Sequence, residues 1–112
     1  MNIETKKVQD VLVVKPAEKR LDAKVAVSFK EAMVEFINTG STLIVLDLSG
    51  VDFVDSSGLG AIVSSLKVLG RKGDIVIAGV GTSVLQMFSL TRMDKVFKMF
   101  PTQEEALQAL SR

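Results

Sequence analysis

Residues 43–66 read LIVLDLSGVDFVDSSGLGAIVSSL, and this stretch decides the fold. Its first part, Leu43–Leu48, is an almost continuous run of branched apolar residues, which is typical of a strand covered on both faces. From Leu59 onward the apolar residues recur at helical intervals, which predicts a helix with one buried stripe. The polar turn Asp55–Gly58 joins the two elements. Its Asp or Ser side chains can accept hydrogen bonds from the first free helix amides, so two serine hydroxyls are expected at a surface-exposed helix N-terminus.

Strand and helix patterns alternate on both sides of this stretch. Before it we expect a strand hairpin at 3–8 and 11–14 that turns near Gln9-Asp10, and then a helix capped by Asp22 that ends near Asn38. After it we expect a strand at 74–78 and a helix capped by Thr82, whose apolar face is Val84/Leu85, Met87 and Phe88. The last elements are a strand at 96–100 and a helix that begins with a Thr102–Glu105 capping box and buries Leu107 and Leu110. Alternation of this kind implies parallel crossovers. We therefore expect one α/β domain over residues 1–112, with a mixed sheet of four to five strands and about four helices.

Composition narrows the possible functions. The chain has 112 residues, a net charge of +1, and neither Cys nor His. Without these residues there is no disulfide, no thiolate zinc site, no Ser-His-Asp triad and no histidine acid–base chemistry. The small net charge gives no reason to expect direct binding of nucleic acid. No apolar run reaches the roughly 20 residues of a membrane span, and the N-terminus lacks the apolar core of a secretory signal, so we expect a cytoplasmic protein.

The glycine motifs do not match nucleotide-binding patterns. Gly58 and Gly60 begin a dinucleotide-like pattern, but Val63 stands where the third glycine belongs. Residues 79–84 fail in the same way, and no Gly-Lys-Ser/Thr sequence forms a Walker A loop. We therefore expect neither enzymatic activity nor a cofactor.

Two clusters of charged residues each allow two interpretations. Three carboxylates follow the central strand: Asp47, Asp52 and Asp55. They could bind magnesium, but exposed charges around a helix start are the more ordinary case, so we expect no metal. Four basic residues lie near the entry to the first helix: Lys15, Lys19, Arg20 and Lys24. They form either an ordinary solvated surface or a patch that faces a partner.

The serines of the polar turn also allow two interpretations. Asp-Ser-Ser-Gly is most often a helix cap and turn. However, the connection before it mixes apolar and acidic side chains, and phosphorylation of one serine would change the local charge by about −2.

The same residues resemble the signature of the STAS domain, and more narrowly that of bacterial anti-sigma-factor antagonists. The central blocks are Ile44–Leu48 and Val51–Gly60. The flanking segments Leu21-Asp22, Met87–Thr91 and Met93–Phe97 resemble the family's first-helix entry, third helix and last strand. The resemblance covers essentially the whole chain, and its most specific part is the Asp-Ser-Ser-Gly-Leu-Gly block.

This resemblance implies a mixed sheet with helices packed mainly on one side, and a role in partner switching. In such families the unmodified antagonist binds an anti-sigma factor that is also a serine kinase, and the binding releases the sigma factor. The kinase then phosphorylates the antagonist, the pair separates, and a PP2C-type phosphatase resets the system. The protein would thus regulate transcription indirectly, as a ligand and a substrate rather than an enzyme.

The phosphorylated residue implied by the resemblance is the serine directly after the Asp, which is Ser56. We expect the partner-binding surface to comprise Asp22, Phe53, Val54, Asp55, Ser56, Ser57, Gly58 and Leu59. Two positions where the family often has glycine are charged here, Lys19 and Arg92. An alternative function is an accessory STAS subunit of a membrane transporter, or a stressosome-like scaffold component. Any weak nucleotide binding would use the helix start at Ser56.

Overall fold

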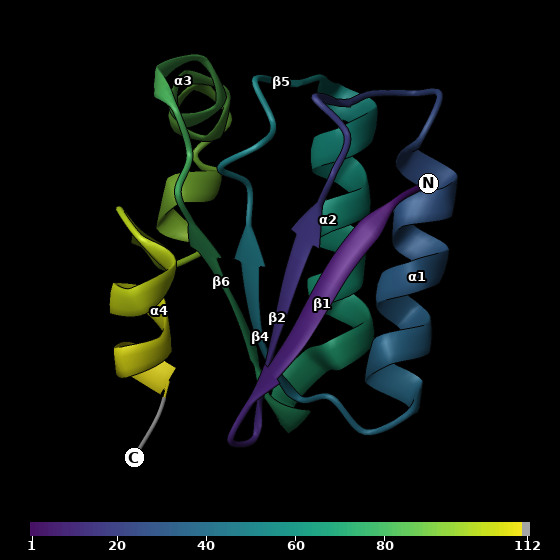
Figure 1. The fold of residues 1–112 in the computed structure, drawn as a ribbon. Coiled ribbons are helices and arrows are strands. Elements are labelled where there is room, and N and C mark those ends of the chain that lie inside the picture. Colours follow the sequence, from purple (N-terminus) through teal and green to yellow (C-terminus); the bar gives the residue numbers. More distant parts are fainter. Residues whose placement is uncertain (111–112) are drawn as a thin grey trace.

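A computed structural model of the chain describes residues 1–110 and contains a mixed five-stranded sheet (Figure 1). Its strands are β1 (Ile3–Val8), β2 (Val11–Pro16), β4 (Leu43–Asp47), β6 (Asp74–Ala78) and β7 (Met99–Phe100). They lie in the order β1-β2-β4-β6-β7. β1 and β2 form the expected antiparallel hairpin, and every later neighbour is parallel.

Residues 1–110 form four α-helices and two short 3₁₀ helices besides the strands. They are α1 (Ala26–Asn38), α2 (Ser56–Leu69), η1 (Gly70–Lys72), α3 (Thr82–Leu90), η2 (Met93–Lys95) and α4 (Gln103–Leu110). α1 and α2 lie side by side on one face, while α4 packs on the opposite face and α3 lies across the end where α2 begins (Figure 1). The α/β class, the five strands and the predominance of helices on one side are all confirmed.

The central strand β4 is buried on both faces, as its apolar run predicted. Ile44 and Leu46 point into the main core under α1 and α2. Val45 points the other way and packs with Val76 and with Ala106 of α4. Because successive side chains of a strand alternate between faces, a strand covered on both sides is apolar at nearly every position.

A second, two-stranded sheet was not predicted. β3 (Arg20–Leu21) pairs in parallel with β5 (Phe53–Val54) beside the start of α2. The amide of Asp52 donates to the carbonyl of Lys19 at 2.8 Å and extends the pairing by one further bond. This small sheet fixes the loop before α1 against the connection that leads into α2.

Two predicted helix caps are wrong. The N-cap of α1 is Val25, which makes no side-chain hydrogen bond. Asp22 lies three residues before it, and its carboxylate accepts from the amide of Lys24 at 3.1 Å within the preceding turn. Gly81, not Thr82, precedes the first residue of α3, and that helix also lacks a side-chain cap. Backbone hydrogen bonds close the turn before α1, because the amides of Val25 and Ala26 both donate to the carbonyl of Asp22.

Near the C-terminus the last strand is shorter than expected, and a 3₁₀ helix and a turn precede it. The last strand is only Met99–Phe100, because Phe97 enters the core and meets Phe88 edge to face with 6.2 Å between ring centroids. In α3, Leu85 is largely exposed rather than part of the buried face. In α4 the fully buried residue is Ala106, while the predicted Leu107 and Leu110 pack at its margins.

Arg92 occupies the turn between α3 and η2 in the left-handed region, with φ 61° and ψ 18°. A side chain there costs about 1–2 kcal/mol relative to the right-handed conformation. Glycine, which the STAS family often has at this position, adopts the conformation without that cost. The turn directs the chain into η2, which borders the functional surface described below.

Candidate functional site

The N-terminus of α2 is held by one carboxylate with two partners. Asp55 Oδ1 accepts from the amide of Gly58 at 2.9 Å, which is the side-chain cap predicted for this helix. Asp55 Oδ2 accepts from the amide of Ala23 at 3.2 Å. The cap therefore also ties the helix to the loop before α1. Beyond it, both Ser56 and Ser57 are exposed.

Close packing against β3 explains the glycine in the first turn. Gly58 is buried, and a Cβ atom placed on it would overlap the backbone carbonyl of Leu21. Only a residue without a side chain lets α2 approach β3 this closely. The amide of Asp55 also donates to the same Leu21 carbonyl, at 3.3 Å. The tip of α2 is thus a rigid platform for the exposed serines.

Two shallow grooves meet at Ser56. The first, here called the α3 groove, has a volume of about 430 Å³ and is bordered by Phe53, Ser83, Gln86, Met87 and Leu90. The second, the α2 groove, has a volume of about 390 Å³ and is bordered by Gly60, Val63, Lys67, Thr91 and Met93. Ser56 lines both grooves, whereas Ser57 lines neither. The geometry therefore distinguishes two serines that the sequence places equally.

Comparison with known proteins agrees with this fold. A profile of the STAS domain matches residues 2–106. The chain belongs to the STAS domain family. This STAS domain is 35% identical over 107 residues to a Thermotoga maritima protein provisionally named an anti-sigma factor antagonist, and the match covers 94% of each chain. It is 29% identical to the anti-sigma-F factor antagonist RsfB of Mycobacterium tuberculosis, over 78% of this chain and 71% of that protein.

A solved structure extends the likeness to three dimensions. The crystal structure of a Thermotoga maritima protein, also named provisionally as an anti-sigma factor antagonist, matches this STAS domain with a TM-score of 0.91 at 34% identity, covering 98% of this chain and 95% of that one. Among residues 1–110, no helix is both long enough and apolar enough to cross a membrane.

The site residues expected from the sequence differ in what they expose. Phe53 is 37% exposed and borders the α3 groove. Val54 lines the α3 groove and Leu59 the α2 groove, but they are only 5% and 6% exposed. Gly58 is buried, and Asp22 is half-buried beside Arg20. The surface that a partner can reach around Ser56 therefore comes mainly from other residues.

Leu90 is the main surface residue that sequence reasoning missed. Its side chain is 83% exposed at the end of α3 and borders the α3 groove. A signal was present, because Leu90 lies off the stripe formed by the buried Val84 and Phe88. Leu90 borders the same groove as Phe53 and Met87, and a contiguous exposed apolar patch of this kind marks a candidate contact surface.

The three carboxylates near β4 do not form one cluster. Asp47 is only 5% exposed, so the interpretation as a solvated carboxylate is wrong for this residue. Within residues 1–110, no three acidic side chains are grouped so that they could hold a metal ion. Asp52 is exposed, and Asp55 is the helix cap already described.

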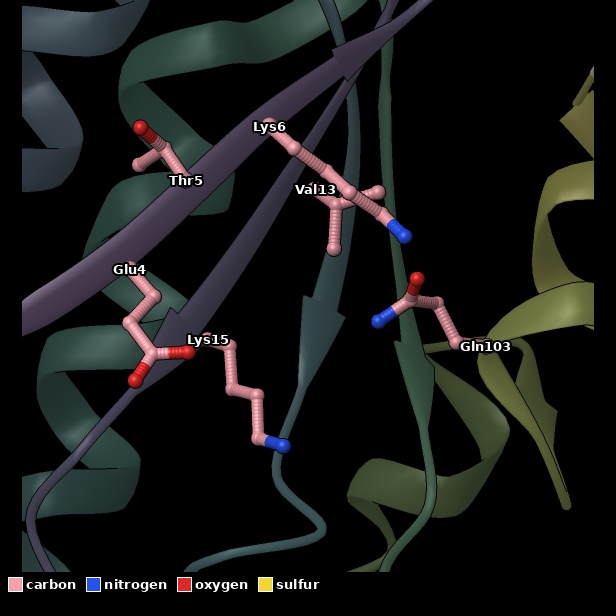
Figure 2. Close-up of a pocket in the computed structure, with 6 residues that line it drawn as sticks. All are labelled: Glu4, Thr5, Lys6, Val13, Lys15 and Gln103. Carbon is pink, nitrogen blue, oxygen red and sulfur yellow. The ribbon is translucent and has the colours of Figure 1, made fainter.

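Asp47 instead fastens α4 to the sheet. Its Oδ2 accepts from Gln103 Nε2 at 2.7 Å, and its Oδ1 accepts from the amide of Ser49 at 2.9 Å. Burial acts to raise the pKa of the Asp47 carboxyl, but the hydrogen bonds from Ser49 and Gln103 and the charge of Lys15 outweigh it, so the pKa lies below its usual value. Gln103 and Lys15 also line a polar cavity of about 250 Å³ over the β1–β2 hairpin (Figure 2).

This lowered pKa gives a testable pH dependence. Because the folded pKa of Asp47 lies below the unfolded value, the carboxylate stabilises the fold above about pH 4, and that contribution is lost as the pH falls through the folded pKa. We expect Asp47→Asn to lower the free energy of unfolding at pH 7 by about 1–3 kcal/mol, because the amide cannot replace both acceptor bonds. Urea unfolding at about pH 7 and pH 3 should show a smaller difference between the two proteins at pH 3. A difference that grows on acidification would contradict this role.

Proposed function

We propose that this STAS domain is an anti-sigma factor antagonist controlled by phosphorylation of Ser56. In its unmodified form it binds an anti-sigma factor through the surface around Ser56, and the phosphorylated form is released. The observation that carries the proposal is that Ser56 is exposed, rigidly placed, and common to both grooves. The names of the curated relatives support the same class of partner.

The surface around the serine suits a neutral protein contact. The exposed side chains of Phe53 and Leu90 offer apolar area on one side of Ser56, and Val63 and Met93 lie on the other. Burying such area drives association, provided that the polar groups enclosed with it are few or paired. A neutral hydroxyl meets this condition, since it can hydrogen-bond within the interface.

A phosphate on Ser56 would oppose the same contact. The kinase would transfer the γ-phosphoryl group of ATP to Ser56 Oγ, releasing ADP and the hydroxyl proton. The added charge of about −2 would lie beside the Asp55 carboxylate and would have to lose water on docking. The dipole of α2 favours an anion at its N-terminus, so the domain itself tolerates the phosphate. The switch therefore acts on the interface and leaves the fold in place.

Three external proteins take part in this cycle, and no residue of the STAS domain acts as a catalyst in it. The anti-sigma factor acts as partner and as serine kinase, the sigma factor is released by the binding, and a PP2C-type phosphatase removes the phosphate. The STAS domain serves as ligand and substrate.

Serine replacements test the assignment of the modified residue. We expect Ser56→Ala to bind the anti-sigma factor kinase but to take up no phosphate from ATP, and Ser57→Ala to be phosphorylated as the wild type is. Both serines are exposed, so neither replacement should disturb the fold. Mass spectrometry after incubation with kinase and ATP measures the outcome. Phosphate found on Ser57 in the wild type would overturn the assignment, and a chain never phosphorylated by any such kinase would favour the accessory or scaffold role.

A further inference from the structure

A basic groove lies next to the Ser56 surface, on the loop between β2 and α1. Its volume is about 470 Å³, and the charged residues that line it are Glu18, Lys19, Arg20, Asp22 and Lys24. Lys15, the fourth basic residue of the cluster seen in the sequence, instead lines the cavity over the β1–β2 hairpin (Figure 2). Three cations and two carboxylates therefore face the basic groove.

The carboxylates of this groove already have partners within the domain. Asp22 accepts from the amide of Lys24 at 3.1 Å and from Arg20 Nε at 3.4 Å. Glu18 Oε1 accepts from the amide of Asn2 at 3.4 Å. The Arg20–Asp22 contact is the single ion pair within residues 1–110, so the ammonium groups of Lys19 and Lys24 have no carboxylate partner there. With three cations and two carboxylates the groove keeps a net charge of +1, and Lys19 and Lys24 are its cations without an ion-pair partner.

The basic groove adjoins the Ser56 surface. The Arg20 guanidinium lies over the ring of Phe53, with its central carbon 4.0 Å from the ring centroid, and Phe53 also borders the α3 groove. The pairing of β3 with β5 and the bond from Ala23 to the Asp55 carboxylate hold the two parts together. A protein that covers Ser56 on the side of Phe53 therefore meets Arg20 and its neighbouring lysines.

We propose that the anti-sigma factor presents an acidic patch to the basic groove, next to the apolar contact at Phe53. This inference rests on the proposed function and adds the polarity of the partner. Two further carboxylates lie nearby. Asp52 is exposed and its amide donates to the carbonyl of Lys19, whereas the Asp55 carboxylate already accepts from two backbone amides. The unpaired Lys19 and Lys24 at the rim attract a negative partner and speed its approach, and Arg20 adds a charge that is held in place by Phe53.

Rates of association test this polarity. The double variant Lys19→Glu/Lys24→Glu is compared with Lys7→Glu/Lys72→Glu, which makes the same change in net charge at exposed sites in β1 and η1, outside the residues that line the basic groove. Each protein is mixed with the anti-sigma factors of its own organism in a stopped-flow or surface-based measurement at about 50 mM and about 500 mM salt, where screening differs strongly. We expect the first variant to associate about tenfold more slowly at low salt, and the control variant by less than about twofold. The difference should shrink at high salt.

The outcomes separate this inference from the function on which it rests. Tight wild-type binding with equal association rates for both double variants would overturn the acidic patch and leave the proposed function intact. Faster association of Lys19→Glu/Lys24→Glu would do the same, because it would show a basic partner surface. Binding of anionic phospholipid vesicles through these lysines, with no effect on the anti-sigma factor, would assign the groove to a membrane and overturn the inference. Failure of the wild type to bind any anti-sigma factor would overturn both.

Discussion

Replacing Ser56 with Asp is expected to weaken binding of the anti-sigma factor about a hundredfold while the domain stays folded. A hundredfold loss corresponds to about 2.8 kcal/mol of binding free energy. The new carboxylate must lose water in an interface that is apolar at Phe53 and Leu90, and it lies beside Asp55, which is already charged. Stability should change by less than about 1 kcal/mol, because an anion in the first turn of α2 is favoured by the helix dipole.

The measurement for this variant is titration calorimetry against the anti-sigma factor, together with urea unfolding. Asn38→Asp is the matched control, since it adds the same charge at an exposed position at the far end of α1. We expect the control to bind as the wild type does. Equal affinity of Ser56→Asp and wild type would show that Ser56 lies outside the interface.

Gly58→Ala is expected to lower the free energy of unfolding by about 3 kcal/mol, a large effect for a single added methyl group. The new Cβ would overlap the carbonyl of Leu21, and a backbone atom in a strand cannot move aside as a flexible side chain can. To relieve the overlap, α2 must shift away from β3. The shift would also strain the bonds that Leu21 and Ala23 make with Asp55, so partner binding should weaken as well.

Gly60→Ala separates this packing effect from helix propensity. Gly60 lies two residues further along the same helix, and a Cβ there meets no atom within 4 Å. Alanine is a better helix former than glycine by about 1 kcal/mol, so this control should be neutral or stabilising. Urea unfolding of both variants gives the comparison. If Gly58→Ala proves as stable as Gly60→Ala, the close approach of α2 to β3 is not a structural requirement.

The main helices and strands were predictable because each contains an apolar pattern that extends over many residues. The apolar run at Leu43–Leu48 and the helical spacing after Leu59 each report burial over several turns or pleats, which is a strong signal. β3 and β5 were not predicted, because a strand of two residues is too short to show an alternation of apolar and polar side chains. The caps expected from Asp22 and Thr82 failed for a different reason, since the side chain of Asp22 bonds within the turn before α1, and Gly81 rather than Thr82 takes the cap position of α3.

Of the candidate site, only the turn that contains Ser56 was predictable. The Asp-Ser-Ser-Gly turn marked Ser56 as an exposed residue at a helix start, and the structure places it so. The grooves beside it could not be read from the sequence, because Leu90 and Arg20 reach the site from parts of the chain that are distant in sequence. The burial of Asp47 was missed for the same reason, since its partner Gln103 lies 56 residues away.

The most direct measurement is the dissociation constant of the anti-sigma factor for the domain carrying phosphoserine at position 56, compared with the unmodified domain. Calorimetric titration of both forms, with identical circular dichroism spectra as the check on folding, supplies it. We expect the phosphorylated form to bind at least about a hundredfold more weakly. Equal dissociation constants for the two forms would contradict a switch that acts through the charge on Ser56.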